Sequence, residues 1–297
     1  MCLDIIDTSR RRRVEEQSIG SYKRTTCGAL LPPWQASNCF PLSFLGIVIP
    51  TSAWFMVMEG VSIDTHLFCV ITCTLSLYFL LSAWLTEPGI LPTVDTEEAR
   101  SDGRLVKKVF LNNRNFPLLQ FRAKYCKELK VTIERFDHFC PWTGNGVGIR
   151  NYHLFFYFLV FTNVHAIFVG VTSLQASAVN TTFRTFLVIL TVYCIAIVCL
   201  VGFLLVYHIF LINQNITTNE KLKSTYGRQG QNPHNKGCFA NWTTFFNNSF
   251  SVRKSYVIQS SRNTFYRLKV DDPSGVKEEE TNDLLGDDSN ARLSATV

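Results

Sequence analysis

The longest apolar stretch of the chain, residues 183–212, reads FRTFLVILTVYCIAIVCLVGFLLVYHIFLI. It exceeds the roughly 20 residues that an α-helix needs to cross a bilayer. Three further apolar stretches precede it, at Phe40–Val57, His66–Leu85 and His153–Leu174. Apolar residues make up 47% of the chain, and they are concentrated in these four stretches. Such clustering is typical of membrane spans rather than of a globular core. The sequence therefore predicts an all-α integral membrane protein with four transmembrane helices.

The positive charges predict how the spans are oriented. Of 29 Lys and Arg residues, six precede the first span, eleven lie between the second and third, and eleven follow the fourth. The short connections 58–65 and 175–182 contain none, and Arg184 is the one exception. By the positive-inside rule, both termini and the long middle loop are cytosolic. A basic body suits an anionic membrane surface, so we expect the bilayer as partner, in endomembranes or the plasma membrane, and no nucleic acid.

The spans divide the chain into segments with different expected roles. Residues 271–297 carry eight acidic and two basic side chains, a composition that favours disorder. The other segments follow from the span boundaries. The predicted organisation is a cytosolic N-terminal segment at 1–39, helices 1 and 2 within 40–85, a small irregular cytosolic domain at 86–152, helices 3 and 4 within 153–213, a cytosolic segment at 214–269 and a disordered acidic tail at 270–297.

The middle loop carries the chemically informative string ERFDHFCPWTGNG, residues 134–146. A thiol is nucleophilic only as a thiolate, and a free cysteine is mostly protonated at neutral pH. His138 precedes Cys140 by two residues and could take its proton, while Asp137 could orient the imidazole and stabilise its charged form. Nucleophile, base and orienting carboxylate together indicate covalent catalysis.

This string resembles the cysteine-rich domain of the DHHC palmitoyltransferases, in which it usually reads Asp-His-His-Cys. The flanking sequence agrees in the same order and at the same membrane positions, so the resemblance covers roughly residues 40 to 246. The matching positions are Glu87-Pro88-Gly89 after the second span, Gly148, Asn151 and Phe155 before the third, Thr217-Thr218-Asn219-Glu220 after the fourth, and Asn232-Pro233, Gly237, Asn241 and Phe245-Phe246 beyond.

The resemblance implies a protein-cysteine S-acyltransferase. The Cys140 thiolate would take a palmitoyl-type chain from acyl-CoA and pass it to a cysteine of a membrane-associated protein on the cytosolic face. In the family, the residues corresponding to Thr217, Thr218 and Glu220 form hydrogen bonds near the Asp137 position, although the same string is also a common helix N-cap. The family uses the Asn241 position to tie the C-terminal segment to the catalytic domain.

Two further groups of residues have an open interpretation. Arg135, Lys124 and Arg150 either bind the phosphates of CoA or are simply positive-inside residues. The aromatic residues of the third span either line an acyl-chain cavity between the spans or pack against helices and lipid. These aromatic residues are Phe155, Phe156, Phe158 and Phe161.

The chain departs from the family at its zinc ligands. Family members hold two zinc ions, each through three Cys and one His. An ungapped alignment on Asp137-His138 places the first set on Asn112, Asn115, Tyr125 and Thr132, and the second on Cys126, Leu129, Phe139 and Gly146. Only Cys126 can ligate zinc in the usual way, so we predict none. Structural zinc contributes folding free energy. An apolar core must replace it, for which the loop offers Tyr125, Leu129, Val131, Ile133, Phe136 and Phe139.

The sequence leaves two functions open. One is an active acyltransferase with a zinc-free domain, favoured by retention of the nucleophile, base and orienting carboxylate. The other is a catalytically inactive scaffold or acyl-chain-binding protein, favoured by loss of the zinc ligands. A channel is disfavoured because the spans hold few ionisable groups, namely His165, Arg184 and His208, and lone span histidines are usually packed.

Overall fold

The computed structural model describes residues 19–25, 30–33, 39–58, 60–99, 105–111, 114–116, 121–226 and 232–250. All of them belong to one compact unit, Met1–Thr264. The acidic tail predicted at 270–297 lies outside the described residues.

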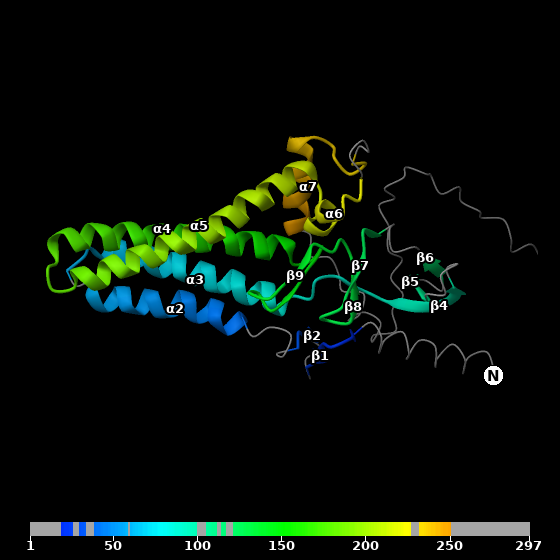
Figure 1. Ribbon diagram of the computed structural model, residues 1–297, viewed down its shortest axis with the longest axis horizontal. Coiled ribbons are helices and arrows are strands. Elements are labelled where there is room, and N and C mark those ends of the chain that lie inside the picture. The colour runs from blue at the N-terminus through cyan, green and yellow to red at the C-terminus, as the bar shows by residue number, and fades with distance from the viewer. Residues whose placement is uncertain are drawn as a thin grey trace, which may run out of the picture. The chain divides into compact units, whose positions relative to one another are not determined.

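Four long helices lie side by side (Figure 1). They are α2 (Phe40–Val57), α3 (Ile63–Leu85), α4 (Tyr152–Val179) and α5 (Arg184–Gln214). Each is long and apolar enough to cross a membrane. The prediction of a four-helix membrane protein is therefore confirmed, with α4 and α5 extending a few residues beyond the predicted spans.

Helix α4 is the central element of the bundle. In its most apolar window 56% of the residues are buried, against 22–28% in the other three helices. It packs on both α3 and α5, and a Cβ at Gly170 would lie only 3.0 Å from the Cβ of Cys194 on α5. Large apolar side chains such as Leu200 and Phe203 remain exposed on α5. An apolar exterior of this kind suits lipid as the surrounding solvent.

The loop between α3 and α4 contains short antiparallel strands rather than irregular chain alone. Strand β8 pairs with β3 and β7, β9 pairs with β10, and β5 pairs with β4 and β6. The bounds are β3 (Ile90–Leu91), β4 (Thr93–Ala99), β5 (Leu105–Leu111), β6 (Arg114–Phe116), β7 (Lys124–Cys126), β8 (Val131–Ile133), β9 (His138–Cys140) and β10 (Asn145–Val147).

The N-terminal segment packs into this loop, which the sequence did not lead us to expect. Strands β1 (Lys23–Arg24) and β2 (Leu30–Leu31) pair with each other. Tyr22 and Leu30 are buried in the apolar cluster of the loop. Gly20 lies in the left-handed region at φ 55°, and a Cβ there would lie 2.5 Å from the carbonyl oxygen of Leu129, so the close approach requires glycine.

The C-terminal segment returns to the same end of the bundle. Helix α6 (Thr218–Leu222) follows α5 after a short turn, and α7 (Cys238–Phe250) packs on α4 and α5. Phe245 of α7 meets Phe156 of α4 edge to face, with ring centroids 5.2 Å apart. The middle loop and the segment after α5 therefore meet where the candidate site lies.

Candidate active site

The candidate nucleophile lies on a tight hairpin beside the end of α3. His138 and Cys140 belong to β9, and Cys140 pairs with Asn145 of β10. The Asn145 side chain donates to the carbonyl oxygens of Trp84 at 2.9 Å and Thr86 at 3.0 Å. Because these carbonyls belong to the end of α3, the hairpin is fixed to a helix that can span the membrane. Cys140 is therefore held at a defined depth relative to the bilayer.

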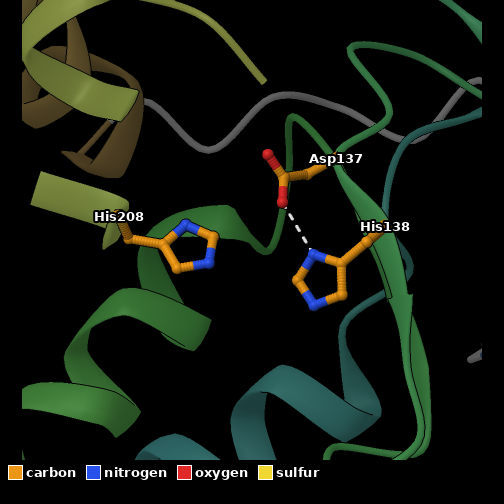
Figure 2. A group of neighbouring side chains, drawn as sticks. All are labelled: Asp137, His138 and His208. Atoms are coloured by element: carbon orange, nitrogen blue, oxygen red, sulfur yellow. Dashed lines mark hydrogen bonds and ion pairs between the residues drawn. The ribbon is translucent and has the colours of Figure 1, made fainter. Parts of the chain in front are cut away.

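Asp137 accepts hydrogen bonds from two directions. Its Oδ2 lies 2.6 Å from Nδ1 of His138 (Figure 2). The backbone N–H of Thr218 donates to Oδ1 and the Thr218 hydroxyl donates to Oδ2, both at 2.8 Å. The carboxylate is 2% exposed, so it meets its partners at low dielectric, where charge-assisted bonds are strong.

The electrostatics of the site favour charge separation. Burial alone would raise the pKa of Asp137, but the hydrogen bond and charge of His138 outweigh it and lower that pKa. Burial opposes a charged His138, yet its hydrogen bonds to Asp137 and Cys140 raise its pKa. Burial would likewise raise the pKa of the Cys140 thiol, but His138 holds it below its usual range. The geometry thus supports a thiolate paired with an imidazolium.

We predict that His138→Gln raises the pKa of Cys140, because burial then acts on the thiol without a compensating charge. Alkylation of Cys140 by iodoacetamide at pH 7 should slow at least about tenfold, since each pKa unit changes the thiolate fraction tenfold. Mass spectrometry of the Cys140 peptide measures the rate. His153→Gln, the same change at another histidine, should leave it unaltered, and an unchanged rate in His138→Gln would exclude the ion pair.

The turn after α5 holds Asp137 on its second side. Thr217 caps α6 by accepting from the backbone N–H of Glu220, and the Glu220 carboxylate accepts from the Thr217 N–H at 2.9 Å. Nε of Arg122 donates to Oε1 of Glu220 at 2.7 Å. This capping box orients Thr218 towards Asp137, so the helix cap and the contact with the carboxylate occur together.

Asn241 holds the segment that precedes α7. Its Nδ2 donates to the backbone carbonyl of Asn213 and to the side chain of Asn235, both at 2.8 Å. It therefore ties the C-terminal segment to the end of α5, and it lines a small pocket together with Arg135 and Asp137 of the middle loop.

The three candidate phosphate-binding residues each have a partner within the protein. Arg135 donates to Oδ1 of Asn215 at 2.6 Å, and Lys124 donates to Oδ1 of Asn219 at 2.9 Å. Arg150 forms an ion pair with Glu87. The structure does not bring them together as one anion site, and a phosphate would have to compete with these contacts.

A cavity of about 520 Å³ opens beside Cys140 between α2, α4 and α5. Its walls are mostly apolar, as the hydrocarbon of a fatty acyl chain requires. Ile47 lines it on α2, Leu159 and Ala166 on α4, and Leu204 on α5. The sulfur therefore lies where a hydrocarbon cavity meets the polar loop.

The aromatic residues of α4 divide between the two interpretations. Phe155 and Phe158 line the cavity. Phe156 instead packs against α7, and Phe161 stacks on Phe79 of α3 at 5.2 Å. The cavity interpretation therefore fits Phe155 and Phe158, and the packing interpretation fits Phe156 and Phe161.

The positions of the second family zinc set converge on an apolar cluster. Cys126 and Leu129 are buried in it, and Phe139 packs against it. A Cβ on Gly146 would lie 2.8 Å from Cδ1 of Ile133 and 3.0 Å from Cδ1 of Leu129. One thiol among four positions, in a mostly apolar cluster, does not fit zinc.

The first zinc set does not fit either. Tyr125 and Thr132 face each other across the β7–β8 pair. Asn112 and the side chain of Asn115 lie outside the described residues. A phenol, a hydroxyl and two carboxamides are not the thiolates and imidazoles that structural zinc takes.

His208 belongs to the site, although its sequence context predicted a packed histidine of the span. It is 1% exposed on α5, and its ring centroid lies 6.0 Å from that of His138. Ligand atoms of Asp137, His138 and His208 lie within 4.8 Å of one another. Figure 2 shows the three side chains together. The sequence feature that could have identified His208 is its position, because the last turns of α5 lead directly to Thr217 and Thr218.

Fold and site together define a multi-pass membrane protein with a cysteine–histidine–aspartate centre at the end of its bundle. Residues 117–225 match the family described as DHHC palmitoyltransferase. The chain is similar to this family over that segment, which contains Asp137, His138 and Cys140.

Curated relatives show the same similarity. The chain is 31% identical to "Probable protein S-acyltransferase 7" of Arabidopsis thaliana, over 58% of this chain and 47% of the relative. It is 26% identical to "Protein S-acyltransferase 8" of the same plant, over 89% of this chain and 74% of the relative. "Palmitoyltransferase ZDHHC9" of Danio rerio is 28% identical, over 64% of this chain and 60% of the relative. The chain thus spans about half the length of the first of these relatives.

Proposed function

We propose that this protein is a protein-cysteine S-acyltransferase that uses long-chain acyl-CoA and forms an acyl-enzyme on Cys140. The observation that carries the proposal is the position of Cys140, which contacts the Asp137-oriented imidazole of His138 and also lines the apolar cavity. A hydrocarbon chain can lie in the cavity while its thioester carbonyl remains beside the thiolate.

The proposed reaction exchanges one thioester for another, twice. The Cys140 thiolate attacks the carbonyl carbon of acyl-CoA, the carbon–sulfur bond to CoA breaks, and the CoA thiolate takes the proton from His138. A client thiol then gives its proton to His138 and attacks the acyl-enzyme, which releases the Cys140 thiolate. Asp137 stays ionised throughout and keeps the imidazole oriented. Because both steps form and break the same type of bond, positioning is the main requirement.

The proposal includes a location and a metal-independent domain. The expected orientation places the site and both termini on the cytosolic side of an endomembrane or the plasma membrane, where the clients would be proteins with cysteines near the bilayer. The loop would fold without zinc because the apolar cluster occupies the place of one metal set.

The test is acylation of the protein purified in detergent. Palmitoyl-CoA should give a hydroxylamine-sensitive adduct on the native chain and none on Cys140→Ser. Folding of both proteins is checked by the protection of buried Cys126 from alkylation. A folded native chain without an adduct would refute the enzyme and leave the scaffold or acyl-chain-binding protein.

The cavity should also set an upper limit on the acyl chain. Ala166 lies eleven residues beyond Phe155 along α4, about 16 Å deeper at 1.5 Å per residue, and lines the cavity. Ala166→Phe should therefore lower adduct formation with palmitoyl-CoA at least about tenfold and leave octanoyl-CoA within about twofold. Ala178→Phe, at an exposed position of the same helix, is the matched control. Equal loss with both chains would mean that the cavity does not hold the acyl group.

A further inference from the structure

His208 is a buried polar residue without a role in the two-step exchange. It lies near the end of α5, ten residues before Thr218, which contacts Asp137. An imidazole that is 1% exposed must find polar partners, since an unsatisfied polar group inside the protein is costly. The groups that contact His208 therefore indicate its role.

One nitrogen of His208 has a defined partner. The Tyr152 hydroxyl, at the start of α4, lies 3.1 Å from Nδ1 of His208. If the phenol donates this bond, Nδ1 is an acceptor and the ring proton is on Nε2. Figure 2 shows the other ring nitrogen of His208 turned towards the Asp137–His138 pair. Ligand atoms of His208, Asp137 and His138 lie within 4.8 Å of one another, so the ring lies beside the pair.

Aromatic packing fixes the ring in that orientation. Phe155 contacts both imidazoles edge on, with centroids 5.0 Å from His208 and 5.2 Å from His138. Tyr207 contacts His208 from its own helix at 5.7 Å. The ring therefore has little freedom to turn away from the pair.

A cation held by the three side chains would be the alternative use of this cluster. Asp137 already accepts three hydrogen bonds, from His138 and from both donors of Thr218. A metal would have to displace at least one of them, including the bond that orients His138. The arrangement therefore suits a hydrogen-bond donor better than a cation.

We propose that His208 is a positioning residue, held by Tyr152 in the tautomer that carries its proton on Nε2, and that it keeps the Asp137–His138 pair charged. This inference deepens the proposed function and rests on it, since the charged pair is what activates Cys140. His208 does not act on the substrate. Its N–H dipole stabilises the carboxylate through space, because ligand atoms of the two side chains lie within 4.8 Å of each other.

The test is the pH dependence of Cys140 alkylation by iodoacetamide, which needs no acyl-CoA. The titratable groups that bear on the thiol are His138 beside it, with Asp137, His208, Tyr152 and Tyr207 behind. His208→Phe keeps the ring shape and removes the N–H. We expect the pH of half-maximal alkylation to rise, and the rate at pH 7 to fall about tenfold.

Two variants separate positioning from structural support. His208→Gln keeps an amide donor near the Nε2 position and should restore the rate at pH 7 to within about threefold of the native value. Tyr152→Phe removes the hydrogen bond that selects the tautomer of His208. It should lower the alkylation rate at pH 7 less than His208→Phe does. His66→Phe, the same change at the far end of α3, controls for the substitution itself.

The outcomes are distinct. An unaltered midpoint in His208→Phe would overturn the inference, as would an equal shift in His208→Phe and His208→Gln. Protection of Cys126 checks that each variant is folded. If His208→Phe shifts the alkylation midpoint as expected but the native chain forms no acyl adduct, the proposed function fails while the positioning role of His208 stands.

Discussion

Asp137→Asn should lower the rate of acyl-adduct formation at pH 7 by about 10³- to 10⁴-fold, with the protein still folded. A neutral amide cannot stabilise the imidazolium of His138, and burial opposes that charge. The Asn oxygen can still accept from the Thr218 N–H, and its NH₂ group can donate to the Thr218 hydroxyl oxygen, so the local fold should persist. The measurement is the initial rate of the hydroxylamine-sensitive adduct.

The pH range of this effect follows from the pKa of Asp137. In the folded protein it is lowered to about 2, below its value in an unfolded chain. The carboxylate is therefore ionised at every pH from 5 to 9, and its contribution to folding is lost only as the pH falls through about 2. The deficit of Asp137→Asn should persist across that range. Asp64→Asn, on the exposed first turn of α3, is the control, and a fall of less than tenfold in Asp137→Asn would contradict the account.

Tyr22→Ala should destabilise the catalytic loop by about 3–5 kcal/mol, the usual cost of removing a buried aromatic ring. Tyr22 is buried in the cluster that occupies the second zinc position. Its hydroxyl donates to Oδ1 of Asn145 at 2.5 Å, and Asn145 pairs with Cys140. The temperature at which buried Cys126 becomes reactive should fall by roughly 10 °C.

The controls for Tyr22 distinguish a loop that is stabilised by an apolar core from one that is stabilised by a metal. Tyr22→Phe keeps the ring, and Asn145 still accepts from the backbone of Gly146, so the cost should be about 1 kcal/mol. Tyr78→Ala, at an exposed position of α3, should have little effect. A strong zinc chelator should leave the native transition unchanged. A chelator effect as large as that of Tyr22→Ala, or about two zinc ions per chain by metal analysis, would show that the loop depends on zinc.

The four-helix architecture was predictable because it depends on local composition. A bilayer requires a run of apolar residues, and such runs are visible in the sequence without knowledge of any contact. The spans observed for α2 and α3 begin or end within a few residues of the predicted positions. The trio of Asp137, His138 and Cys140 was recognisable for a similar reason, since its members lie within four residues.

The contacts that the sequence did not reveal join distant parts of the chain. Tyr22 meets Asn145 across 123 positions, and no local pattern marks an aromatic residue of a polar segment as part of a core. His208 resembled a packed span histidine until the fold placed it beside Asp137. Lys124 and Arg150 looked available for phosphate, but their partners Asn219 and Glu87 are 95 and 63 residues away.

The most direct test of the account is to locate the acyl group. The native chain is incubated with palmitoyl-CoA at neutral pH, digested without reduction, and analysed by mass spectrometry for palmitoylated peptides. We predict that the Cys140 peptide carries the chain first and that Cys140→Ser carries none there or elsewhere. A chain that appears on exposed Cys238 or Cys199 at the same rate with and without Cys140 would contradict the account.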